Sequence, residues 1–286
     1  MRNYLGLIGI AFAITMSSCI KEGYDDENCR DEYNITVTWP VGTPGDDDKT
    51  TITIINPDGT KTTIHPNDPT ELEEGKHQIS GVSGNDDDKV EVDGSTVTVK
   101  PKEDGTAGDP GDFMGGSTDI EITQDSKPNI EVPMIQQSRP LVIKVKLEGY
   151  GVDAIDQITG MVSGIALSRH INDGFVPVDG KPRHPALQSG NVSYDSMPKG
   201  EDGFYTGNQR LLGIDGDASQ QLGLTVELTD GTILNFPFDI TTDMDGFHVT
   251  DVTQPWVIEI VLHLGADFHA TIEDWKVGPE EWMEAQ

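Results

Sequence analysis

The sequence is poor in basic residues, in aromatic residues and in cysteine. Its 286 residues include 19 Lys and Arg against 50 Asp and Glu, which gives a formal net charge of -31 at pH 7, and only two cysteines. This excess of negative charge disfavours binding to nucleic acids and to anionic membrane surfaces, and it leaves cationic partners or bridging divalent ions as electrostatic attractions. Two cysteines exclude a framework of several disulfides.

Motifs of catalysis and of metal binding are also lacking. The sequence contains no P-loop, no dinucleotide fingerprint, no HExxH pair and no CxxC spacing. Ser163 lies between two glycines but without the Gly-x-Ser-x-Gly spacing of a nucleophile elbow. With fifty carboxylates, a pair suited to glycoside hydrolysis cannot be selected from the sequence. We therefore expect no enzyme, no cofactor and no resident metal ion.

Three acidic segments invite a calcium interpretation. They are Asp46–Asp48, Asp86–Asp88 and Gly213–Ser219. The first two each precede a lysine and open a predicted strand, where a solvated turn is the usual explanation. The third departs from an EF-hand loop, because its glycine is misplaced and Val226 stands where a bidentate glutamate is needed. We expect solvated turns rather than calcium sites.

Histidine and tryptophan do not cluster in the sequence. The seven histidines, none paired on one predicted helix face, are His65, His77, His170, His184, His248, His263 and His269. Trp39 and Trp256 stand at the ends of predicted strands and are expected to be core plugs or strand anchors. The sequence leaves the roles of Trp275 and Trp282 in the tail undecided, since two exposed rings on one face could form a glycan platform.

The N-terminus is typical of a secretory signal. Arg2 supplies a positive charge, and the apolar run from Leu5 to Met16 is too short to cross a bilayer stably. We therefore predict a signal peptide over residues 1–18.

The residues that follow indicate lipidation. Met16-Ser17-Ser18-Cys19 resembles a bacterial lipobox, which implies acylation of Cys19 and cleavage before it; the alternative is a plain secreted protein with an incidental cysteine. Several acyl chains attach a protein to a membrane far more durably than one. Residues 19–33 form a short acidic tether, similar to the signal that sends lipoproteins to the outer face of the outer membrane in some Gram-negative anaerobes. We thus expect a lipid-anchored protein at the cell surface.

Cys29 has no intramolecular partner once Cys19 carries lipid. It could be a free thiol, an intermolecular bridge or a second acylation point. A bystander thiol near the anchor is the interpretation that we prefer.

The remainder of the chain has the pattern of an all-β protein. Short runs of alternating apolar residues, bounded by Gly, Pro, Asn and Asp, recur throughout. In the first half, strands or hairpins are predicted at 34–39, 50–65, 76–82, 89–100, 119–123 and 130–134, with a loose segment at 101–117. Pro57-Asp58-Gly59 and Asp93-Gly94 are hairpin turn signals.

A second β pattern begins after a junction at 136–140. Strands are predicted at 141–149, 190–197, 203–214, 222–241 as a hairpin, 256–265 and in the tail at 271–286, where a short helical end could follow. The segment 154–174 has a partly helical pattern at its start. We predict a signal peptide, a tether and two antiparallel β-sandwich domains, at 34–137 and 138–286.

Taken together, these segments resemble the fimbrillin superfamily, and the second half resembles its FimB-type, anchor-like fimbrial subunits. The resemblance is carried by the lipobox, the early second cysteine, "YNITVTW" at 33–39 and, in the second half, by residues 139–149, 158–174, 222–241 and 252–264. It implies two tandem transthyretin-like sandwiches and a role in a surface pilus. It also implies assembly by strand complementation, in which an extended segment of one subunit completes a sheet of its neighbour.

The resemblance further implies a role for Arg30. Shaft subunits of this superfamily are cut after an arginine near the N-terminus and lose their lipid, whereas anchor subunits keep it. Arg30 is the only arginine between Cys19 and the first predicted strand, and cutting there would remove only the tether. We therefore expect an anchor or accessory subunit that contacts outer-membrane lipid through Cys19 and other fimbrial subunits through its sandwiches. The alternative is a solitary surface lipoprotein that binds glycans or host proteins through its loops.

Overall fold

The computed structural model describes residues 32–40, 45–85, 88–124, 129–175, 186–248, 252–267 and 269–279. Eighteen strands and three single 3-10 turns account for the regular structure of these residues, none of which forms a helix of the length and apolarity needed to cross a membrane. The predicted all-β class is confirmed. The strands are β1 (Glu32–Thr38), β2 (Thr50–Ile55), β3 (Lys61–Ile64), β4 (Pro69–Glu71), β5 (Gly75–Ser83), β6 (Val90–Asp93), β7 (Thr96–Val99), β8 (Met114–Ile122), β9 (Asn129–Pro133), β10 (Ile135–Gln136), β11 (Arg139–Gly149), β12 (Ile155–His170), β13 (Gln188–Tyr194), β14 (Tyr205–Leu211), β15 (Gln221–Leu228), β16 (Ile233–Asp239), β17 (Trp256–Leu264) and β18 (Ala270–Pro279).

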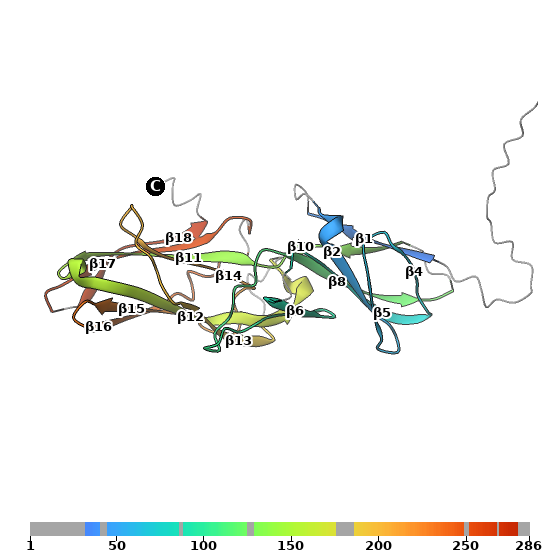
Figure 1. Ribbon diagram of the computed structural model, residues 1–286, viewed down its shortest axis with the longest axis horizontal. Coiled ribbons are helices and arrows are strands. Elements are labelled where there is room, and N and C mark those ends of the chain that lie inside the picture. Colours follow the sequence, from blue (N-terminus) through green and yellow to red (C-terminus); the bar gives the residue numbers. More distant parts are fainter. Residues whose placement is uncertain are drawn as a thin grey trace, which may run out of the picture.

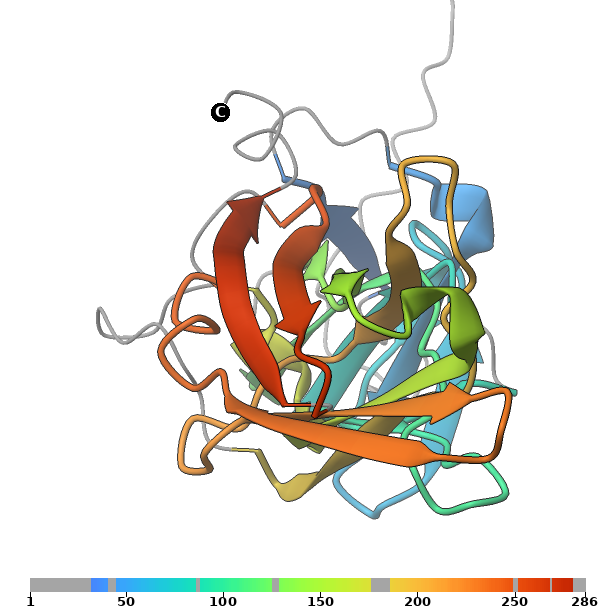
Figure 2. The ribbon, with the colours of Figure 1, turned by 90° about the vertical axis from the view of Figure 1, so that its left-hand side faces the viewer.

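The strands form two sandwiches that follow one another along the long axis of the molecule (Figure 1). In the first, a sheet of order β4-β1-β9 packs on one of order β10-β8-β5-β2-β3. In the second, β14-β11-β17-β18 packs on a sheet that contains β16-β15-β12, with β13 also paired to β12. Viewed along that axis, the red strands β17 and β18 and the orange hairpin β15–β16 lie in different layers (Figure 2). We refer to the two sandwiches as the first and the second unit.

The two units repeat one seven-strand topology. β1·β4, β2·β3, β2·β5 and β5·β8 pair antiparallel and β1·β9 parallel in the first unit. β11·β14, β12·β13, β12·β15, β15·β16 and β11·β17 repeat these pairings in the same chain order and with the same directions. The sequence predicts antiparallel sheets throughout, and the pair of first and last strands is the parallel exception in each unit.

The repeat extends to single residues of the parallel pairs. Ile35 is the register partner of Ile130 and Val37 that of Val132, while "IKVK" at 143–146 pairs in the same way with "IEIV" at 258–261. The alternate side chains Ile35, Val132, Ile143 and Ile258 are completely buried. These apolar residues recur at every second position because successive side chains of a strand point to opposite faces. Each parallel pair thus contributes fully buried side chains to its unit's core.

Two features distinguish the units. Residues 88–112, which we call the clasp segment, are inserted between β5 and β8 of the first unit. Their hairpin β6–β7 pairs with the end of β12 in the second unit, where Thr98, Val97 and Thr96 lie opposite 168–170. Strand β18 is an addition to the second unit, next to β17.

The clasp segment contributes to the core of the second unit. Val90, Val97, Val99 and Ala107 are at most 4% exposed and belong to the same apolar cluster as Ile158 of β12. The Ala107 amide donates to the Asn191 carbonyl (2.8 Å), and Lys102 Nζ donates to the Ser193 carbonyl (2.9 Å). The predicted boundary between residues 137 and 138 therefore divides strands that are hydrogen-bonded to each other and side chains that share one core.

Buried polar side chains join the units at their junction. Gln137 donates through Nε2 to the carbonyls of Gly115 (2.9 Å) and Ile171 (2.8 Å). Arg169 donates to the carbonyls of Leu212 (2.9 Å) and Gln137 (2.7 Å), and its burial lowers the pKa of its guanidinium to about 10. Buried donors that reach carbonyls of both units hold the junction in one arrangement, because leaving such groups unpaired is costly.

Two expectations for local structure are wrong. The start of 154–174 is not helical: one 3-10 turn at Val152–Ala154 leads directly into the sixteen-residue strand β12. The segment 101–117 is not loose to its end, because β8 begins at Met114. Position 116 of this strand is a glycine because a side chain there would collide with the Pro133 carbonyl.

Candidate functional site

The exposed strand edges are the candidate site, because an edge presents unpaired backbone groups to other chains. In the second unit β18 covers the outer edge of β17. It pairs antiparallel over the whole of β17, from Trp256 opposite Pro279 to Leu264 opposite Ala270. Its first half is exposed, with Ile272 54% accessible, whereas its last residues are buried.

Trp275 fastens β18 to the opposite layer. Its ring packs against that of Phe238 on β16, with centroids 5.5 Å apart, and its side chain hydrogen-bonds to the Asp243 carboxylate. Burial raises the pKa of Asp243, and the bond to Trp275 opposes that rise. Trp275 is therefore a partly buried packing residue of β18 rather than a fully exposed ring. Trp282 lies outside the described residues.

Replacing Trp275 by Phe tests this attachment. The ring contact with Phe238 is kept while the bond to Asp243 is lost. Asp243 is only partly buried, so solvent screens this bond and we expect it to contribute about 0.5–1 kcal/mol. We therefore expect amide hydrogens of β18 to exchange roughly two- to fivefold faster, with little change in the first unit. Hydrogen exchange measured by mass spectrometry reports both regions, and unaltered exchange in β18 would contradict the attachment.

Among the described strands, the first unit has no counterpart of β18. Strand β9 ends its sheet, and among the residues that the structure describes no strand pairs with its outer edge. Its side chains alternate, with Ile130 and Val132 buried and Glu131 exposed. The edge is five residues long and carries Pro133, which cannot donate a hydrogen bond. Short length and proline are the usual protections of an edge against uncontrolled association.

The first strand is not an exposed edge. β1 lies between β4 and β9, and its residues Tyr33 and Ile35 are at most 4% exposed. It begins at Glu32, so the last two residues of the predicted tether are already part of the sheet. Arg30 precedes it by two residues and, like Cys19 and Cys29, lies outside the described residues.

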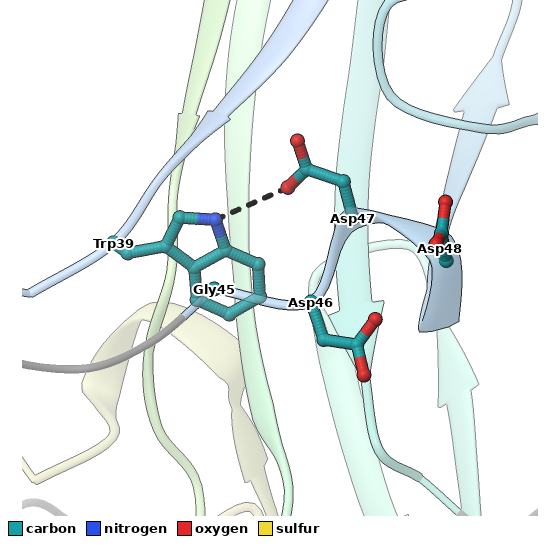
Figure 3. A pocket seen from close by; sticks show the side chains of 5 residues that line it. All are labelled: Trp39, Gly45, Asp46, Asp47 and Asp48. Atoms are coloured by element: carbon teal, nitrogen blue, oxygen red, sulfur yellow. Dashed lines mark hydrogen bonds between the residues drawn. The ribbon is translucent and has the colours of Figure 1, made fainter.

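An acidic surface lies at the start of β2. Trp39 donates through Nε1 to the Asp47 carboxylate (3.2 Å), whereas the carboxylates of Asp46 and Asp48 point away from the indole (Figure 3). These residues and Gly45 line a hollow of about 420 Å³. Gly45 lies flat against the indole, where no side chain would fit. Trp39 thus closes the end of β1 over Gly45, as expected of a strand anchor.

A second hollow adjoins the first. It has a volume of about 510 Å³ and is lined by Asp47, Asp48 and residues 65–68. Across the described part of the chain, no three His, Cys, Asp or Glu side chains are placed to share a metal ion. Lys49 pairs with Asp46 (2.9 Å) and lowers the pKa of that carboxyl. The exposed carboxylates of this surface are expected to attract cations electrostatically.

Three of the other candidate residues lie around the 213–219 segment of the second unit. The Ile214 amide donates to His248 Nε2 (3.0 Å), and the Asp215 amide donates (2.9 Å) to the carbonyl of Gly164, which follows Ser163. Asp215 of the 213–219 segment accepts from the amides of Ala186 (3.1 Å) and Asp217 (3.0 Å), so it organises a turn. His77 and His248 are 2% exposed and packed in the two units, and His184 lies outside the described residues. Ser163 lies on β12, where its hydroxyl accepts from the Gln221 amide (3.2 Å). The side chains of Asp215, His248 and Ser163 each accept from a different backbone amide, so in the described part of the chain they are engaged separately rather than with one another.

Solved structures with a similar fold are found, whereas comparison of the sequence finds no match. Neither a family model nor a curated protein matches the chain. The fimbrial anchor protein Mfa2 from Porphyromonas gingivalis superimposes with a TM-score of 0.60 over 88% of this chain and 98% of that one, at 9% identity. The chain shares its fold with a fimbrial anchor protein.

Two further solved structures have the same fold. A candidate adhesin from Bacteroides ovatus aligns with a TM-score of 0.59 and 13% identity over 87% of this chain and 96% of that one. A candidate polysaccharide-binding protein from Bacteroides thetaiotaomicron aligns with a TM-score of 0.51 and 10% identity, over 87% and 99%. Each alignment extends through both units. The predicted relationship in fold to fimbrial anchor subunits is thereby confirmed.

Proposed function

We propose that the chain is a non-enzymatic surface lipoprotein that serves as an anchor or accessory subunit of a pilus. In this proposal, acyl chains on Cys19 hold it in the outer membrane, and neighbouring fimbrial subunits join it by β-strand complementation. The shared fold with a fimbrial anchor supports the pilus context.

The position of β1 carries the choice of an anchor. β1 begins at Glu32 and is hydrogen-bonded on both sides, so cleavage after Arg30 would leave the first unit intact and open no groove in it. In such a subunit, cleavage after Arg30 would remove the lipid without opening a groove for a neighbouring subunit. The cut would therefore not promote assembly. Retention of the tether is therefore the state that fits the fold.

The native N-terminus tests the proposal. We expect mass spectrometry of the protein from its own membranes to find acylated Cys19 at the N-terminus and an uncut Arg30. We also expect a ladder of other fimbrial subunits to co-purify and to survive mild denaturant, because backbone hydrogen bonds along a strand dissociate cooperatively. An unacylated, monomeric protein in the periplasm, or one that starts at Asp31, would contradict the anchor.

The alternative of a solitary glycan or host-protein binder receives less support. Trp275 is partly buried against Phe238, so less of its ring is open to a saccharide. A solitary binder would purify as a monomer with saccharide-dependent tryptophan fluorescence, so the co-purification experiment separates the two functions.

A further inference from the structure

We propose that the outer edge of β9 is the docking site for an extended segment of a partner subunit. In this proposal the segment runs antiparallel to β9 and places a basic residue opposite Glu131. The inference rests on the proposed function, for which it names the surface and the kind of partner, and it leaves β1 in place.

The second unit shows how the edge is filled. β17 is the counterpart of β9 in the repeat, since each is the last of seven strands and pairs in parallel with the first. β17 carries the added strand β18 along its outer edge, whereas β9 carries none among the described residues. In the second unit, β18 thus pairs with the outer edge of β17. The corresponding edge of β9 in the first unit is available to another chain.

Backbone geometry shows which groups of β9 are available. The Met134 amide donates to the Thr38 carbonyl (2.8 Å), and in a parallel ladder alternate residues bond to the same neighbour. Ile130 and Val132 therefore bond to β1, while Glu131 directs its backbone groups outward. Glu131 can both donate and accept, whereas Pro133 has no amide hydrogen and its carbonyl lies against Gly116 of β8. The edge thus admits a short strand whose pairing ends at Pro133.

The charge of Glu131 indicates which kind of partner segment fits this edge. Glu259 is the counterpart of Glu131 and faces Lys276 of β18, with Oε1 and Nζ 3.6 Å apart. Glu131 is exposed and occupies the same position of the register, next to buried Ile130 and Val132. Opposite charges across a strand pair are favourable, and like charges are unfavourable. Since a second copy of this chain would bring a net charge of -31, a partner subunit with a basic segment fits the edge better.

A peptide with the sequence of residues 270–279 provides the probe, because it carries the pattern of β18. We expect it to bind to the full mature chain and to slow amide exchange in β9. Glu131→Lys should weaken binding about five- to tenfold, since an attractive cross-strand pair becomes a repulsive one. A peptide with Lys276→Glu should recover the lost affinity when it is paired with the Glu131→Lys variant, and with no other. Glu91→Lys, on the exposed edge strand β6, is the matched control and should leave the affinity unchanged.

A second variant tests the backbone. Glu131→Pro removes the outward amide, and binding should fall below detection, whereas Thr63→Pro on the edge strand β3 should have no effect. Equal binding to the wild type and to Glu131→Lys, or protection of β17 instead of β9, would overturn the proposal. So would dimerisation of the chain through this edge, since the occupant would then be a second copy.

The same variants separate this inference from the proposed function. If the wild-type chain co-purifies with a fimbrial ladder and Glu131→Lys does so equally well, the docking site is wrong and the anchor role stands. If the wild type brings down no ladder, the anchor role itself fails, whatever the peptide does.

Discussion

Residues 138–286, expressed without the preceding part of the chain, are expected not to fold cooperatively. Six buried apolar side chains of the second unit's core precede residue 138, namely Val82, Val90, Val97, Val99, Ala107 and Phe113. Burying a valine or a phenylalanine contributes about 1.5–3 kcal/mol, so the four valines and the phenylalanine together supply on the order of 10 kcal/mol. A whole domain is stable by only about 5–15 kcal/mol.

Near-ultraviolet circular dichroism and thermal unfolding provide the measurement. The fragment should show neither fixed aromatic signals nor a sharp transition, whereas the mature chain should unfold in a single step that involves both units. Adding a peptide that covers the clasp segment should restore part of the structure. Cooperative unfolding of residues 138–286 alone would show that β6–β7 is an accessory and that the second unit is independent of it.

Arg139→Ala should lower the free energy of unfolding by about 3–5 kcal/mol, because it leaves a cavity and two buried carbonyls without their donor. Arg139 is completely buried and donates to the carbonyls of Gln254 (2.8 Å) and Phe247 (2.6 Å). Its guanidinium also lies 5.1 Å from the ring centre of Trp256. In a chain of this size, such a loss corresponds to a fall in melting temperature of about 6–20 °C.

Arg210→Ala is the matched control. Arg210 lies opposite Pro140 on the neighbouring strand β14, and its side chain is 25% exposed, pairs with Asp112 at 3.1 Å and donates to the Ser138 carbonyl at 3.3 Å. An ion pair and a hydrogen bond near the surface together contribute about 1–2 kcal/mol. Calorimetry of both variants should therefore show a large shift for Arg139 and a small one for Arg210. Similar shifts would mean that burial of Arg139 adds nothing to the stability of the junction.

Local sequence signals predicted the hairpins and most strands. The turn at Asp230 connects β15 and β16 as expected, and its geometry follows from the aspartate itself, whose carboxylate accepts from the Thr232 amide (2.9 Å). The bond lowers the pKa of Asp230. Asp58 and Asp104 form the same kind of turn with a threonine two residues later. Such signals are readable because all the interacting groups lie within four residues of one another.

Features that depend on distant segments could not be read in this way. Nothing local in 90–99 specifies that its partner is β12, seventy residues further along the chain. The glycines at 115 and 116 suggested a loop, although they belong to a strand that other segments approach closely. The strands β4 and β10 are three and two residues long, too short for a periodic pattern. The open edge of β9 emerges only when the two units are compared.

The parallel pairing of β1 and β9 has a mechanical consequence. If the protein is held at the membrane through its N-terminus, tension enters β1 at Glu32, while β9 leads at its other end through β10 into the second unit. Two parallel strands pulled from opposite ends are loaded in shear, so that their hydrogen bonds resist together rather than opening one after another. A tether at the N-terminus would thus pull on a pair of strands that resists tension along its length.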